Sequence, residues 1–78
     1  MDDWPERYSA ALDIRLTDEE VDAILDLARE VAHATERRFA PLSAYLAGKF
    51  VGQRVAAGAT GSDAVHEAKE VAGRLLTQ

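Results

Sequence analysis

The most restrictive feature of the sequence is the segment 41–57, which is apolar on nearly every side of the helix that it predicts. Small residues recur along it at every fourth position, namely Ala44, Gly48, Gly52 and Ala56. A helix that is apolar nearly all round belongs in the centre of a fold. Each glycine costs about 1 kcal/mol of helix propensity relative to alanine, so we expect close contact with another helix, either of the same chain or of a second copy. If the contact is with a helix of the same chain, replacing Gly48 or Gly52 by leucine should destabilise the fold.

Two apolar stripes precede this segment. Residues 4–13 place Trp4, Tyr8 and Leu12 on one helix face. Residues 17–36 begin with a capping box, in which Thr17 and Glu20 each bind the other's backbone amide. The expected core stripe of this second helix has a period of 3.6 residues and comprises Val21, Ile24, Leu25, Ala28, Val31, Ala32 and Thr35.

A turn at residues 58–61 separates the third helix from a fourth, which Thr60 or Ser62 can cap. The apolar side of that helix comprises Val65, Ala68, Val71, Ala72, Leu75 and Leu76. No strand pattern, repeat or linker is evident. The sequence therefore predicts an all-α fold, a single compact four-helix antiparallel domain over residues 1–78 with the third helix at its centre.

The size and composition of the chain limit its stability and its location. A chain of 78 residues buries only about 60–65% of the surface of its unfolded form. It has no cysteine, so a partner chain is the expected source of extra stability. The absence of cysteine suits a reducing compartment. No long apolar run is present, and Met1 is followed by Asp2 and Asp3. We therefore expect a cytoplasmic protein without a membrane span or secretory signal.

Charge is distributed unevenly along the chain. The formal net charge of −5 divides into −8 over residues 1–36, with eleven acids against three arginines, and +3 over residues 37–78. An acidic total argues against nucleic-acid binding, which relies on many cationic contacts to phosphates. The acidic half either orients a protein partner or forms a solvated helix face.

The residues that could carry chemistry do not form a recognisable centre. Two carboxylate-x-x-histidine pairs, Glu30 with His33 and Asp63 with His66, are similar to ligand pairs of dimetal helix bundles. Both pairs lie opposite the apolar stripes of their helices, and the third helix supplies no carboxylate. No serine has a catalytic setting, and no glycine-rich loop follows a strand. We expect neither an enzyme nor a metal or cofactor.

The best local candidate for a binding site is the turn before the third helix. Arg37 and Arg38 stand beside helix amides that have no side-chain cap at Ala40, His33 lies one turn earlier, and Ser43 follows in the helix. Such a turn can bind an anionic group, either on a protein partner or on a small ligand such as a pterin or nucleotide. The alternative is that the arginines only cap the preceding helix and pair with nearby acids.

Some apolar surface should remain exposed on so small a chain. The expected contributors are Trp4, Tyr8, Val51 and Val55. They would form the interface of a homodimer or a surface that binds a different protein.

Two stretches carry a family resemblance. ILDLAREVAHATER (residues 24–37) and APLSAYLAG (residues 40–48) resemble a small actinobacterial domain of unknown function, which occurs alone or joined to the C-terminal end of a molybdenum cofactor guanylyltransferase. The resemblance extends from about Trp4 to Leu75, but Arg38 stands where that family tends to have proline. It implies an accessory role in molybdopterin cofactor maturation, with the guanylyltransferase or a molybdoenzyme as partner. It implies no transferase activity and no catalytic residues.

Overall fold

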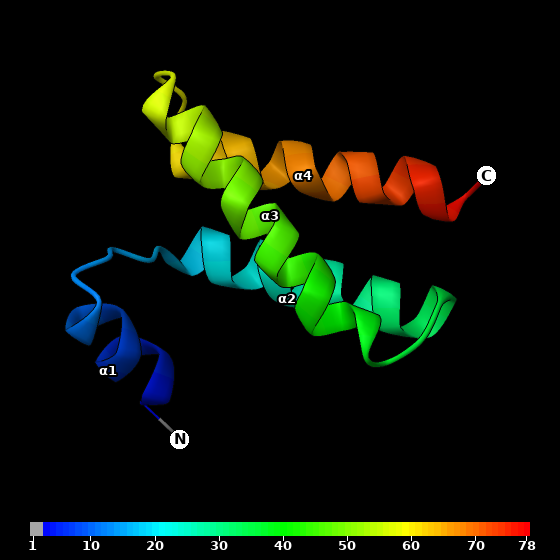
Figure 1. Ribbon diagram of the computed structural model, residues 1–78, viewed down its shortest axis with the longest axis horizontal. Helices are drawn as coiled ribbons and strands as arrows, with labels where there is room; N and C mark the ends of the chain where they lie inside the picture. Colours follow the sequence, from blue (N-terminus) through cyan, green and yellow to red (C-terminus); the bar gives the residue numbers. More distant parts are fainter. Residues whose placement is uncertain (1–2) are drawn as a thin grey trace.

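The computed structural model describes residues 3–78 and contains four helices, α1 (Trp4–Ala11), α2 (Asp18–Ala34), α3 (Phe39–Ala56) and α4 (Gly61–Leu76). The described residues include no strand, so the predicted all-α, four-helix class is confirmed. Each of α2, α3 and α4 packs against the other two. Successive long helices run in opposite directions, and α3 crosses in front of α2 and α4 (Figure 1).

Hydroxyl caps define where the two amphipathic helices begin. The amide of Glu20 donates to Thr17 Oγ1 at 3.1 Å and the amide of Thr17 donates to Glu20 Oε1 at 2.9 Å, which confirms the predicted capping box. Thr60 caps α4 by accepting from the amide of Asp63 at 3.1 Å. These bonds satisfy amides that have no partner inside the helix, and they hold both helix starts in place.

The starts of α2 and α4 are also joined to each other. The hydroxyl of Ser62 donates to the carboxylate of Glu19. The carboxylate of Glu20 lies so close to Gly61 that a Cβ at that position would collide with it. Acidic groups are stabilised near a helix N-terminus by its partial positive charge, so these contacts bind the first turn of α2 to the first turn of α4.

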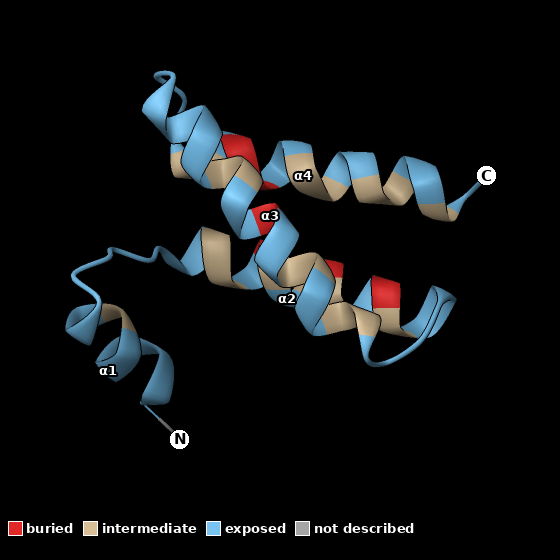
Figure 2. Ribbon diagram, in the orientation of Figure 1, coloured by how far each residue is buried: buried red, intermediate tan, exposed pale blue. Residues whose placement is uncertain are grey.

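Three of the six described residues in the buried core are alanines. The core comprises Ala23, Leu27 and Val31 of α2, Ala47 of α3, and Ala64 and Val65 of α4 (Figure 2). The expected stripe of α2 was wrong at Leu25, which is 61% exposed, and at Thr35, which is exposed and follows the last residue of the helix. Because α2 packs against both α3 and α4, its buried line runs through residues 23, 27 and 31.

The third helix packs against both of its neighbours, but they cover only one of its sides. Ala47 is its buried residue, whereas Leu42, Tyr45 and Leu46 are 57%, 67% and 65% exposed. The Cα trace is only 17 Å thick in its thinnest direction, which corresponds to about two helix layers. α3 forms the front layer and α2 and α4 lie behind it (Figure 1). The described helices therefore leave the outer side of α3 uncovered.

The glycines of α3 do not mark a close helix contact within the chain. A Cβ added at Gly48 or Gly52 would meet nothing within 4 Å among the described residues outside the local helix. The expectation that a helix of the same chain packs against these glycines is therefore wrong. The second alternative, contact with another copy, remains a prediction.

The first helix stands apart from the other three. Within residues 3–78, α1 packs against neither α2, α3 nor α4, and Figure 1 shows it beyond the start of α2. The rings of Trp4 and Tyr8 are stacked with centroids 5.2 Å apart. Asp3, which precedes the helix, makes no side-chain capping bond. The helix ends at Ala11, two residues earlier than expected.

We predict that Gly48→Ala and Gly52→Ala each raise the free energy of unfolding by about 0.5–1 kcal/mol, because alanine is the better helix former and the added methyl group meets open space. Urea unfolding followed by circular dichroism measures this change. Gly58→Ala is the contrasting variant. Its φ of 108° is strained for any residue with a Cβ, so it should lower stability. A loss of stability in the two α3 variants would show that another surface packs against these glycines.

Candidate functional site

An apolar groove of about 310 Å³ runs between α3 and α4. Leu46 on one wall and Leu75 on the other are 65% and 63% exposed. Buried Leu27 of α2 belongs to the same lining. The complete lining comprises Leu27, Ser43, Leu46, Ala47, Phe50, Ala68, Val71, Ala72 and Leu75. Exposed apolar surface gathered around a hollow is typical of an interaction site.

The hollow follows from where small and large side chains fall on the two helices. Along α4, residues 68, 71, 72 and 75 share one face because they are spaced by three and four. Ala68 and Ala72 are too short to fill the space between the helices, whereas Val71 and Leu75 project from the wall. On α3, Ala47 is buried and Leu46 stands beside it. The alternation of alanine with larger residues therefore produces a groove.

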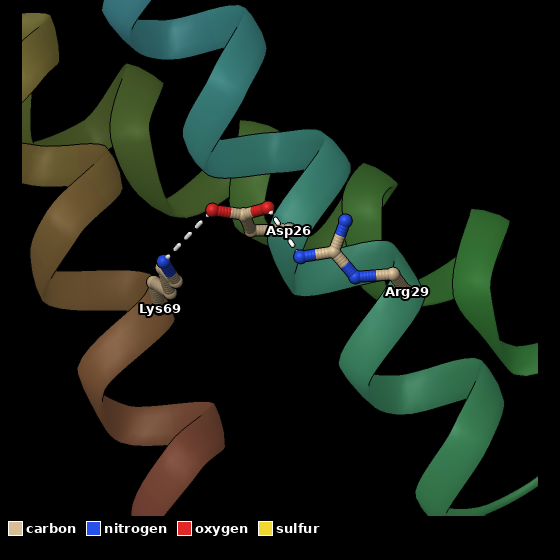
Figure 3. A network of polar contacts seen from close by, with 3 residues as sticks. All are labelled: Asp26, Arg29 and Lys69. Atoms are coloured by element: carbon tan, nitrogen blue, oxygen red, sulfur yellow. Dashed lines mark hydrogen bonds and ion pairs between the residues drawn. The ribbon is translucent and has the colours of Figure 1, made fainter.

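An ion pair between Lys69 and Asp26 joins α4 to α2, and Arg29 of α2 also contacts Asp26 (Figure 3). Lys69 Nζ lies 3.2 Å from Asp26 Oδ2, and Arg29 Nη2 lies 2.7 Å from Asp26 Oδ1. The hydrogen bond and charge of Lys69, with a smaller contribution from Arg29, lower the pKa of the Asp26 carboxyl below its ordinary value of 3.8, although desolvation opposes the shift. The Lys69–Asp26 pair helps to set the position of the α4 wall.

A second pair joins α3 to α4 at the Phe50 end of the groove. Arg54 Nε lies 3.2 Å from Glu67 Oε1, and the guanidinium carbon of Arg54 lies 4.9 Å from the centroid of the Phe50 ring. Because both charged side chains are about half exposed, the ion pair contributes at most about 1 kcal/mol. Its main consequence is geometric, since it places a cation over an aromatic ring of the groove.

The predicted anion site at the start of α3 lacks the free amides on which it partly depended. The helix begins at Phe39 and not at Pro41. The amide of Phe39 donates to the carbonyl of Glu36 at 3.0 Å, and that of Ala40 donates to the carbonyl of Arg37 at 3.1 Å. Pro41 has no N–H. The amides of residues 39 and 40 are therefore already used by the turn.

The other residues of that predicted site are distributed over different surfaces. Arg37 and Arg38 are exposed, and Arg38 Nε lies 3.5 Å from a Glu36 carboxylate oxygen. His33 lines a shallow hollow between α2 and the end of α4. Ser43 lines the apolar groove. Binding at Arg37 and Arg38 stays a prediction without further support.

The residues expected at an interface lie outside the groove lining. Trp4 and Tyr8 of α1 are 53% and 52% exposed, and Val55 of α3 is 46% exposed, whereas Val51 is half-buried. Sequence reasoning missed the groove residues Leu46, Val71 and Leu75, because the nearly all-apolar third helix and the apolar stripe of the fourth helix both predicted a core. Their exposure depends on which faces the neighbouring helices reach, and the stripes do not contain that information.

The described residues hold no group of three or more potential metal ligands. His33 and His66 are both exposed, and His66 Nδ1 lies 2.8 Å from the carbonyl oxygen of Ser62. No helix in residues 3–78 is long and apolar enough to cross a membrane.

Fold and site together define a small all-α domain with an exposed apolar groove. The chain belongs to the family described as a domain of unknown function (DUF6457), whose model matches residues 1–78. Neither a curated protein nor a solved structure matches the chain.

We predict that Asp26→Asn lowers stability at neutral pH. The pKa of Asp26 is lowered in the folded protein, so the stabilisation from this carboxylate is complete above its ordinary pKa and is lost as the pH falls through the lowered value. The stability difference between wild type and variant should therefore shrink below about pH 4. Urea unfolding at pH 7 and pH 3 tests this. Asp22→Asn, an exposed change on the same helix, is the control. An equal difference for Asp26→Asn at both pH values would contradict the prediction.

Proposed function

We propose that this domain is a non-catalytic interaction module that binds another protein chain through the groove between α3 and α4. The observation that carries the proposal is the exposure of Leu46 and Leu75 on opposite walls of one apolar hollow. Large apolar side chains gathered in this way are stabilised when a partner removes them from water, by about 25 cal/mol per Å² of apolar surface.

The chemistry of the lining supports binding without catalysis. Ser43 supplies a hydroxyl, and every other described residue in the lining is apolar. Acid–base catalysis needs titratable groups within reach of a substrate, and the described residues of the lining include none. Arg54, which lies over the Phe50 ring, is engaged in an ion pair. Lys69, which follows Ala68, is engaged in another. A groove of this composition suits the apolar face of a partner helix, in the manner of helix-in-groove recognition.

The family resemblance supports a particular context for the partner. We propose that the domain acts as an accessory to molybdopterin cofactor maturation or to molybdoenzymes, with the molybdenum cofactor guanylyltransferase as the first partner to test. That context places the domain in the cytoplasm, which suits a chain without cysteine.

The test compares two leucines of similar exposure on different surfaces. Leu46→Glu places a carboxylate in the groove and should weaken binding to purified guanylyltransferase by at least about tenfold, because burial of an unpaired charge is costly. Leu25→Glu is the matched control, since Leu25 is 61% exposed on α2 and lies outside the groove lining. Titration calorimetry measures both affinities.

Three outcomes separate the parts of this proposal. A loss of binding with Leu46→Glu alone supports both the groove and the partner. Equal affinities for wild type and both variants would remove the groove as the docking site. A wild-type domain that does not bind would exclude this guanylyltransferase as the partner.

A further inference from the structure

The first helix is too short to be stable without a surface to pack against. It has eight residues, and isolated helices shorter than about 12–15 residues are marginal in water. Yet α1 packs against none of the other helices in the described chain. Residues of α1 and of the linker to α2 together line one mostly apolar hollow. These residues are Trp4, Pro5, Tyr8, Ser9, Leu12, Ile14 and Leu16. We therefore looked for a complementary surface.

The groove between α3 and α4 matches α1 in length and character. Its walls extend from Ser43 to Phe50 and from Ala68 to Leu75, and each range is about 10 Å long at 1.5 Å per helical residue. The eight residues of α1 measure about 12 Å by the same rule. The groove is apolar. The stacked rings of Trp4 and Tyr8 lie on successive turns of α1 and form an aromatic face.

Charge also favours this pairing. Residues 3–13 carry the carboxylates of Asp3, Glu6 and Asp13 against one arginine. The α3 wall belongs to a helix with Lys49 and Arg54 and no carboxylate. Within α1 itself Glu6 is balanced by Arg7. The complementarity to the basic α3 wall therefore comes from Asp3 and Asp13, which flank the helix.

The ends of the linker prevent α1 from reaching the groove of its own chain. On one side, the amide of Ile14 donates to the carbonyl of Ser9 at 2.9 Å, and Asp13 adopts a left-handed φ of 57°. On the other side, Thr17 is held in the capping box. An extended chain from residue 13 to residue 17 spans at most about 14 Å.

The groove lies farther away than this span. Because Lys69 pairs with Asp26, the α4 wall starts about level with residue 26, which is about 13 Å along α2 from Thr17. A helix seated over Leu27 would also lie about 8–10 Å to the side of α2. The two displacements combine to about 16 Å, which is more than the roughly 14 Å that the linker spans, so the distances favour an α1 that comes from another molecule.

The exposed area is sufficient for such an interface. A compact monomer of 8.5 kDa exposes about 4,700 Å², whereas this chain exposes 6086 Å². The excess of about 1,400 Å² is larger than the roughly 800 Å² per partner that a standard interface buries. Each copy carries both α1 and the groove, so reciprocal exchange closes with twofold symmetry.

We propose that α1 of a second copy occupies the α3–α4 groove, so that two chains exchange their first helices. This inference rests on the proposed function of the groove and names a second copy as its occupant. A different partner protein must then displace α1 from the groove in order to bind there.

Sedimentation equilibrium tests the dimer, and single-cysteine variants test where α1 sits. At micromolar concentrations we expect twice the mass of one chain for wild type, and the mass of one chain for Tyr8→Glu and for Leu46→Glu. Ala10→Glu on the other side of α1 and Leu25→Glu on α2 are the controls and should remain dimeric. Circular dichroism of each variant verifies that α2, α3 and α4 remain folded.

The chain has no cysteine, so cross-links can be assigned without ambiguity. An oxidised mixture of Tyr8→Cys and Val71→Cys chains should give the mixed disulfide dimer, whereas Tyr8→Cys with Leu25→Cys should not.

A wild-type mass of one chain would overturn the exchange, as would a dimer that fails to form the mixed disulfide. If the chain is monomeric and Leu46→Glu still abolishes binding to a different protein, the exchange fails and the interaction module stands. If Leu46→Glu affects neither property, both proposals fail.

Discussion

Close packing of three helices through small side chains is the constraint on which the rest of this structure depends. Ala23 of α2, Ala47 of α3 and Ala64 of α4 are buried, and each of these helices packs against the other two. Alanine lets helix axes approach closely, but it removes little apolar surface from water. The larger buried residues, such as Leu27 and Val65, add to a core that cannot enclose every apolar side chain of the chain.

The surface of the domain follows from that small core. Tyr45 and Leu46 of α3 are both largely exposed, and Leu46 forms part of the groove wall. Short alanine side chains leave a hollow between α3 and α4 where Val71 and Leu75 rise above Ala68 and Ala72. The groove is therefore a direct consequence of how the helices pack, and the Asp26–Lys69 ion pair helps to hold one of its walls in position.

The separation of α1 has a local cause as well. The left-handed turn at Asp13 ends that helix, and the capping box at Thr17 starts the next one. The short linker between these two ends leaves α1 beyond the start of α2 (Figure 1), where it packs against none of the other described helices. The apolar surface of α1 and the apolar groove are thus two exposed features of one chain, and one physical arrangement of two copies removes both from water.

Local chemistry in the sequence was sufficient for the helices and their starts. The Thr17–Glu20 capping box, the turn at residues 58–61 and the all-α class depend on neighbours within four residues, and the structure confirms each of them. The periodic stripes showed which residues are apolar, but not which of them become buried. Burial depends on the direction from which neighbouring helices approach, and this placed Leu27 in the core and Leu25 in solvent.

The tertiary structure alone decided the candidate site. In the sequence, Gly48 and Gly52 indicated close helix contact, and the structure shows open space beside them. Leu46 and Leu75 are 29 positions apart, and they share a groove only because α3 and α4 pack against each other and against α2. A sequence pattern determines which side chains a helix offers on each face. The angles and distances between helices determine which of those faces remain in water.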